Sequence, residues 1–166
     1  MTVPTPSQTA GPFVTLGTEW LASGRLVADG SPGAIVLAGK VFDGEGEPVT
    51  EAMVEFWQAG AEAGAALITR AITGPDGSYR LVTAKPKSGA PYIGISIFAR
   101  GLLQRLVTRA YFDDEAAANA ADPALALVPL ARRGTLLARR DPRGPALYNF
   151  DIHLQGERET VFFAPA

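Results

Sequence analysis

Short runs of alternating apolar and polar residues, separated by turn signals, begin at Ala34 and continue to the end of the chain. Two-residue alternation of this kind is typical of β-strands with one buried face. The run at 50–58 places Met53, Glu55 and Trp57 on one face and Val54, Phe56 and Gln58 on the other. Similar runs predict strands at 34–42, 67–73, 78–84, 92–99, 105–112, 148–154 and 160–163. We therefore expect an all-β fold, an antiparallel β-sandwich.

The segment 113–121, DDEAAANAA, is the one part of the chain with a helical pattern. Its alanine body predicts a short helix, and three acidic residues at its start fit capping and the helix dipole. Residues 1–33 are rich in Pro, Thr, Ser and Gly, and they predict an extended N-terminal arm. Four apolar residues favour packing of this arm against another surface: Phe13, Val14, Leu16 and Trp20. The expected organisation is an arm at 1–33 and a sandwich domain at 34–166.

Composition narrows the range of functions. The chain has 166 residues, a net charge of −2 and no cysteine, which excludes disulfides, zinc–thiolate sites and cysteine nucleophiles. The acidic balance gives no general electrostatic reason to bind nucleic acid or an anionic membrane. The first residues lack a secretory signal pattern, and no apolar run approaches a membrane span. We expect a cytoplasmic protein with neither nucleic-acid nor membrane partners.

Candidate chemical groups are few. His153 is the single histidine and lies on the polar face of a strand, where a surface or interface role is favoured over metal ligation. A basic stretch at 132–143 lacks interleaved aromatic residues and is interpreted as a solvated loop or a contact for an acidic protein. Arg100, at the end of a strand, fits a carboxylate clamp and a structural ion pair equally well. No self-contained catalytic site and no metal site can be assembled from these residues.

Several segments, in order along nearly the whole chain, resemble the intradiol ring-cleaving dioxygenases, and among them the alpha chains of members that act on protocatechuate. The segments are TPSQTAGPF (5–13), GKVFDGEGEPV (39–49), VEFWQA (54–59), GPDGSYRLVTAKP (74–86), APYIGISIFARGLLQRLVTRAYFDDE (90–115) and YNFDIHLQGERETVFF (148–163). The resemblance implies a prealbumin-like sandwich and a hetero-oligomer with a homologous beta subunit. It also implies a complex that inserts both atoms of O₂ into protocatechuate, giving 3-carboxy-cis,cis-muconate.

The resemblance further implies a non-haem Fe(III), which the family's catalytic chain holds with two tyrosines and two histidines. In this chain Tyr92 and Gly94 stand where the two histidines would be, and a single histidine cannot supply both. The tyrosine expected after VEFWQA is absent from 60–68 as well. The iron is therefore expected on the partner beta subunit rather than on this chain.

By the same resemblance, the arm and one arginine of this chain border the partner's iron pocket and contact substrate. Carried over position by position, these residues are Thr9, Gly11, Pro12, Phe13 and Arg100. The family often has tyrosine where this chain has Phe13, so Phe13 offers an apolar wall without a hydroxyl. Three alternatives remain: a non-catalytic binding or scaffolding sandwich, a single-chain dioxygenase, and a transthyretin-like hydrolase or binding protein.

Overall fold

The computed structural model describes residues 4–11, 14–18, 23–59, 66–86, 90–144 and 146–164. Its strands are β1 (Ala34–Phe42), β2 (Met53–Ala59), β3 (Ala66–Ile72), β4 (Ser78–Ala84), β5 (Tyr92–Phe98), β6 (Leu106–Phe112), β7 (Leu137–Arg140), β8 (Leu147–Asn149) and β9 (Ile152–His153). Its helices are α1 (Val14–Thr18), α2 (Ala116–Ala121), α3 (Pro123–Leu127), α4 (Leu130–Arg133) and a 3₁₀ turn, η2 (Gly134–Leu136).

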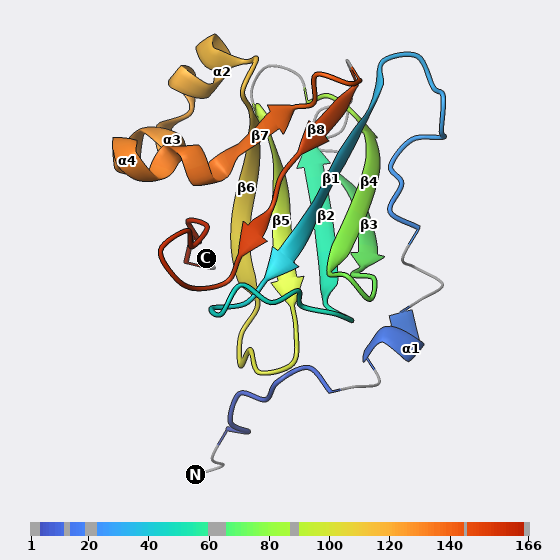
Figure 1. The fold of residues 1–166 in the computed structure, drawn as a ribbon, viewed down its shortest axis with the longest axis vertical. Helices are drawn as coiled ribbons and strands as arrows, with labels where there is room; N and C mark the ends of the chain where they lie inside the picture. The colour runs from blue at the N-terminus through green and yellow to red at the C-terminus, as the bar shows by residue number, and fades with distance from the viewer. Residues whose placement is uncertain are drawn as a thin grey trace.

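The strands form two layers that share β7 (Figure 1). The hydrogen-bonded order is β3-β2-β5-β6-β7-β8-β1-β4, and β9 pairs with the end of β1. Alternate residues of β1 and β5 point into the space between the layers, where Leu37, Val41, Ile93 and Ile95 are fully buried. The predicted all-β sandwich is confirmed. Its pairing is mixed, because β1–β8, β1–β9 and β6–β7 are parallel.

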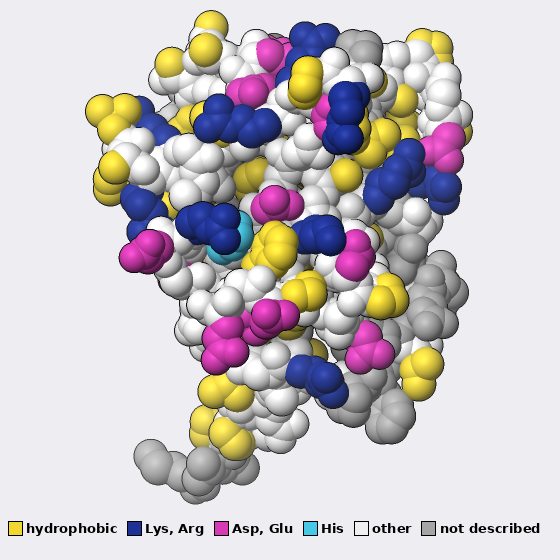
Figure 2. Space-filling view, viewed as in Figure 1, with side chains coloured by type: hydrophobic (Ala, Val, Ile, Leu, Met, Phe, Trp, Pro, Cys, Tyr) yellow, Lys and Arg dark blue, Asp and Glu magenta, His cyan; other side chains and the backbone are white. Residues whose placement is uncertain are grey.

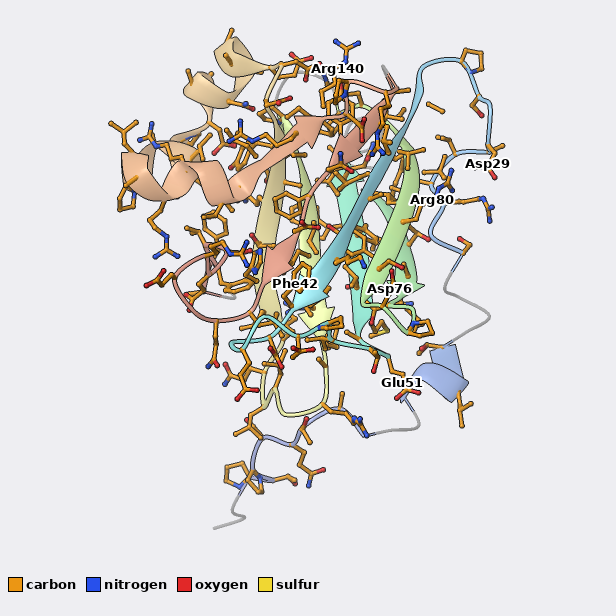
Figure 3. The ribbon with its side chains drawn as sticks, viewed as in Figure 1. Asp29, Phe42, Glu51, Asp76, Arg80 and Arg140 are labelled. Atoms are coloured by element: carbon orange, nitrogen blue, oxygen red, sulfur yellow. The ribbon has the colours of Figure 1, made fainter. Side chains whose placement is uncertain are left out.

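The end of the arm belongs to the domain's own edge. The Gly24 N–H donates to the Arg70 carbonyl of β3 at 2.8 Å, and the Val82 N–H of β4 donates to the Gly24 carbonyl at 2.8 Å. Asp29 also lies beside Arg80 of β4, with carboxylate and guanidinium 3.7 Å apart (Figure 3). The segment from residue 23 onward therefore bridges the outer edges of the two layers. Earlier in the chain, residues 4–11 extend beneath the loop between β5 and β6 (Figure 1).

The expectation of one helix is wrong, because the described residues contain four short α-helices. The predicted helix begins at Ala116, and Glu115 at its N-cap makes no side-chain capping bond. Asp114 instead pairs with Lys85 at 2.7 Å and accepts a hydrogen bond from the Tyr148 hydroxyl at 2.9 Å. The acidic cluster thus ties α2 to β4 and β8 rather than capping the helix.

The basic stretch at 132–143 is not a loop. It forms the end of α4, η2 and β7, and β7 pairs with β6 on one side and β8 on the other. Arg133 donates to the carbonyls of Val128 and Ala126 at 2.8 and 2.9 Å, and so closes the short helices against each other. No helix in the described part of the chain is both long and apolar enough to cross a membrane.

Candidate functional site

The arm meets the loop that carries Arg100. The Gly101 N–H donates to the Thr9 Oγ1 at 2.8 Å, and the Thr9 hydroxyl donates to the Ala99 carbonyl at 3.4 Å. Gly101 adopts a φ of +89°, a backbone conformation that suits glycine and turns the chain sharply after β5. Thr9, a predicted site residue near the N-terminus, is thereby held beside the turn that carries Arg100, a second predicted site residue in the middle of the chain.

A shallow groove of about 270 Å³ lies at this junction. Thr9 and Ala10 of the arm line one side, and Phe98, Leu102 and Gln104 line the other. Its lining combines apolar residues with the polar residues Gln8, Gln104 and Arg105. The groove is therefore built jointly from the arm and the β5–β6 loop, and neither segment forms it alone.

Arg100 is exposed beside this groove and makes no ion pair with any carboxylate in the described ranges. Its guanidinium fork is consequently available to a ligand or partner. Gly11 is also exposed, and a Cβ placed there would meet no atom within 4 Å. Packing within the described residues therefore gives no reason for glycine at this position. Pro12 and Phe13 lie outside the described residues.

The positions expected to correspond to the iron ligands lie on the outer face of β2, β5 and β6. On this face Trp57 pairs across the strands with Gly94, and Gly94 pairs with Arg109. The indole of Trp57 lies directly over Gly94, so a Cβ at Gly94 would stand 1.9 Å from Trp57 Cε2. Neither histidine nor any other side chain fits at position 94 while the indole holds this place.

Aromatic and cationic groups fill the rest of this face. The Trp57 and Tyr92 rings meet edge to face at 5.8 Å, and the Arg109 guanidinium stacks 4.1 Å from the centre of the Tyr92 ring. Arg109 also donates to the Tyr111 hydroxyl at 3.3 Å and lies 3.5 Å from Asp122. Burial raises the pKa of the Tyr111 phenol to about 12, although the Arg109 bond opposes this.

The only histidine stands apart from this cluster. His153 lies on β9 and stacks on Phe42 of β1, with ring centres 5.0 Å apart. No group of three or more His, Cys, Asp or Glu residues in the described part of the chain is arranged to hold a metal. The residues present do not fit a ferric centre made of two tyrosines and two histidines.

Sequence reasoning missed Trp57 and Arg109. The alternation at 50–58 placed Trp57 on one face of its strand together with Met53 and Glu55, but only the structure shows that its indole covers Gly94. Arg109 is a single arginine inside a largely apolar strand, so the sequence pattern does not mark it as part of a site. Its role depends on cross-strand neighbours that sequence alone does not reveal.

The fold matches that of intradiol dioxygenases. It superimposes on the dioxygenase domain of a dioxygenase–carbohydrate-binding fusion from Streptomyces sp. SirexAA-E, with a TM-score of 0.61 and 27% identity over 93% of this chain and 99% of that one. An intradiol ring-cleavage dioxygenase from Tetranychus urticae gives a TM-score of 0.59 over 80% of this chain and 86% of that one, at 13% identity. No family model matches the chain.

Similarity in sequence identifies the family to which the chain belongs among the intradiol dioxygenases. The chain is 42% identical to the protocatechuate 3,4-dioxygenase alpha chain of Burkholderia cepacia, over 96% of both sequences, and 42% identical to that of Pseudomonas putida, over 96% of this chain and 95% of the relative. The corresponding beta chain of Burkholderia cepacia is 33% identical over 76% of this chain and 66% of its own length. The chain belongs to the family of protocatechuate 3,4-dioxygenase alpha chains.

Proposed function

We propose that this chain is the alpha subunit of a protocatechuate 3,4-dioxygenase, in which a homologous beta subunit holds the ferric iron. The complex would cleave protocatechuate between its two hydroxyl-bearing carbons, using both atoms of O₂ and giving 3-carboxy-cis,cis-muconate, in the cytoplasm. Family membership supports the activity. The filled outer face at Trp57, Gly94 and Arg109 supports placing the iron on the partner.

The observation that carries the proposal is the hydrogen bond between Gly101 and Thr9. It fixes the arm beside Arg100, so that both can be presented together to a partner's pocket. Arg100 would then offer its planar fork to the carboxylate of protocatechuate. Because the guanidinium is exposed in this chain, the interaction would gain strength only when the partner excludes water from it.

The arm is proposed to complete the same pocket from the side. Gly11 would allow the partner's backbone to approach closely, which accounts for a glycine that has no packing role within the described residues. Pro12 would stiffen the wall, and Phe13 would give it an apolar surface. Residues 1–33 would thus act partly as an arm on the beta subunit, while the end of the segment stays bound to the chain's own sheet edge.

The test is to produce this chain alone, its cognate beta chain alone, and both together. Iron content and protocatechuate-dependent O₂ uptake are then measured for each preparation. We expect full activity only in the joint preparation, with iron in proportion to the beta chain. Iron and turnover from this chain alone would overturn the proposal. A stable chain that never associates with the beta chain would instead support a scaffolding module.

A further inference from the structure

A second hollow, remote in sequence from the arm, lies between α4–η2, β7, β8 and the segment after β9. Its volume is about 420 Å³, and Leu137 and Phe150 contribute apolar surface to it. A space of this size is within the range of small-molecule sites in proteins. Nothing in the proposed dioxygenase function uses this hollow.

The hollow is lined by cations from three separate segments. Arg132 comes from α4, Arg139 from β7 and Arg158 from the segment after β9. Among the described residues, the carboxylates in the lining are those of Asp151 and Glu157. Three guanidinium groups therefore face two carboxylates, which gives the hollow a positive balance on a chain whose net charge is −2. Figure 2 shows basic side chains gathered around the histidine on this face.

These arginines differ from their neighbours in the same stretch. Arg133 is satisfied by two helix carbonyls, and Arg143 forms a bidentate pair with Asp141. Arg132, Arg139 and Arg158 make no ion pair with any carboxylate in the ranges that the structure describes. Their charge is therefore offset only in part, by the more distant carboxylates of Asp151 and Glu157 in the same lining.

Arg132 is also held in place. Its Nη2 donates to the Glu159 carbonyl at 2.7 Å, which joins α4 to the C-terminal segment. Its Nε is buried and has no hydrogen-bond partner among the described residues. The bond from Nη2 to Glu159 therefore fixes the Arg132 side chain at the edge of the hollow. The side chain of Arg132 is thus held in one position at the wall of the hollow before any ligand binds.

His153 completes the lining. Its ring is stacked on Phe42 (labelled in Figure 3), and its backbone N–H donates to Thr160 Oγ1 at 3.0 Å, so the imidazole is fixed in position. Burial, and then the nearby charge of Arg158, lower the pKa of His153, while Asp151 opposes the shift. Both His153 and Arg158 line the hollow.

We propose that this hollow binds a small oxyanion with at least two negative charges, carboxylate or phosphate in chemistry. Planar guanidinium forks bind both groups through paired hydrogen bonds. A small ligand is favoured over an acidic protein segment, because the cations converge on a concavity from three sides instead of forming a flat basic surface. An acidic segment of a partner is one outcome of the test.

The test is calorimetric titration of the alpha–beta complex and of the chain alone, at low ionic strength, with citrate and with inorganic phosphate. We expect binding in both preparations. Arg139→Gln and Arg158→Gln should each weaken it about tenfold, the effect of losing one charge-assisted interaction. Arg80→Gln is the matched control, because Arg80 is an exposed arginine on β4 paired with Asp29. Thermal unfolding of each variant verifies that the fold is intact.

Binding of citrate, of phosphate or of both supports the site and shows whether the hollow accepts carboxylates, phosphates or both. If neither citrate nor phosphate binds, the proposal is overturned. An equal loss of affinity in Arg80→Gln also overturns it. Binding to the free chain that disappears in the complex also overturns it, since the hollow would then be a contact for the partner. These readouts need neither iron nor turnover, so they are independent of the proposed dioxygenase activity.

Discussion

The backbone N–H of Gly101 donates to the hydroxyl oxygen of Thr9 across 92 positions of sequence, at 2.8 Å. This bond joins an arm with few other described contacts to the turn after β5. Because the turn contains Arg100, the bond couples the position of the arm to that of the turn that carries a charged side chain. The first two predictions follow from this coupling.

Replacing Thr9 by valine should raise the KM for protocatechuate about fivefold in the alpha–beta complex. The substitution removes the hydroxyl while keeping the branched shape, and one hydrogen bond of this kind contributes about 1 kcal/mol. Thr9→Ser keeps the hydroxyl and is the matched control, with KM expected near that of the parent. Steady-state O₂ uptake measures both. If Thr9→Val and Thr9→Ser behave alike, the hydroxyl has no part in presenting the arm.

Replacing Arg100 by alanine should raise KM for protocatechuate more than it lowers kcat. The guanidinium is proposed to contact the substrate's carboxylate, which is present in both the ground state and the transition state. Removing the guanidinium therefore weakens the binding of both states equally, which raises KM and leaves kcat largely unchanged. We expect at least a fivefold effect, since an ion pair closed from water exceeds the ~1 kcal/mol of an exposed one. Arg80→Ala is the control, and an unchanged KM in Arg100→Ala removes Arg100 from the substrate's path.

The two substitutions can be combined. If Thr9 acts by positioning the loop that carries Arg100, the double variant should lose less than the sum of the two single losses. Full additivity would mean that the arm and Arg100 contribute independently. The same kinetic measurement decides this, with the four proteins of the cycle prepared side by side.

The strands that alternate clearly were predictable from sequence, and β1 and β4 coincide with the predicted runs at 34–42 and 78–84. Each has a buried face whose apolar residues recur every second position. β7 was missed because two of its four residues are arginines and because its parallel partner β6 is separated from it along the chain by α2, α3 and α4. Its existence depends on tertiary pairing, which leaves little trace in local composition.

The short helices α3 and α4 were missed for a related reason. Segments of four or five residues are too short to be stable by helix propensity alone, so they form only where neighbours support them. In the sequence, Pro123 fits a position just after the end of a helix. In the structure it is the first residue of α3, where a backbone N–H would have no partner within the helix. Asp122 caps α3 through the N–H groups of Ala124 and Leu125, whereas the sequence had predicted capping only by the acidic cluster at 113–115, at the start of α2.

Only part of the candidate site was predictable from the sequence. A resemblance over whole segments led us to predict Thr9 and Arg100, but the bond that holds Thr9 to the turn carrying Arg100 depends on the path of the arm. The absence of a second histidine argued against iron on this chain, while the physical obstruction, the Trp57 indole over Gly94, required the sheet register. Composition can therefore show that ligands are missing, and only structure shows what occupies their place.

Replacing Gly94 by alanine should lower the stability of the chain by about 1–3 kcal/mol, the usual cost of overpacking. The added Cβ would lie 1.9 Å from the Trp57 indole, which is itself packed edge to face against Tyr92. Denaturant unfolding measures the loss. The double variant Trp57→Leu/Gly94→Ala should recover part of it, because the smaller side chain vacates the space. Equal losses in the single and double variants would locate the strain elsewhere.

Asp141 should make the stability of the chain dependent on acid pH. Its carboxylate accepts hydrogen bonds from the backbone, Nε and Nη2 of Arg143 and from Nδ2 of Asn149, and these bonds hold the pKa of Asp141 well below its ordinary value. A depressed pKa means that the stabilisation is fully present above the unfolded-state value, about 3.9, and is lost as the pH falls through the folded-state value.

Asp141→Asn should therefore lower Tm at neutral pH, and the difference from the parent should shrink as the pH falls below about 4. Thermal unfolding over an acid pH series measures both quantities. Glu45→Gln is the control, since Glu45 is exposed and its side chain makes no hydrogen bond or ion pair with a described residue. A Tm difference for Asp141→Asn that stays constant across the acid range would show that the carboxylate's charge does not contribute to holding the turn between β7 and β8.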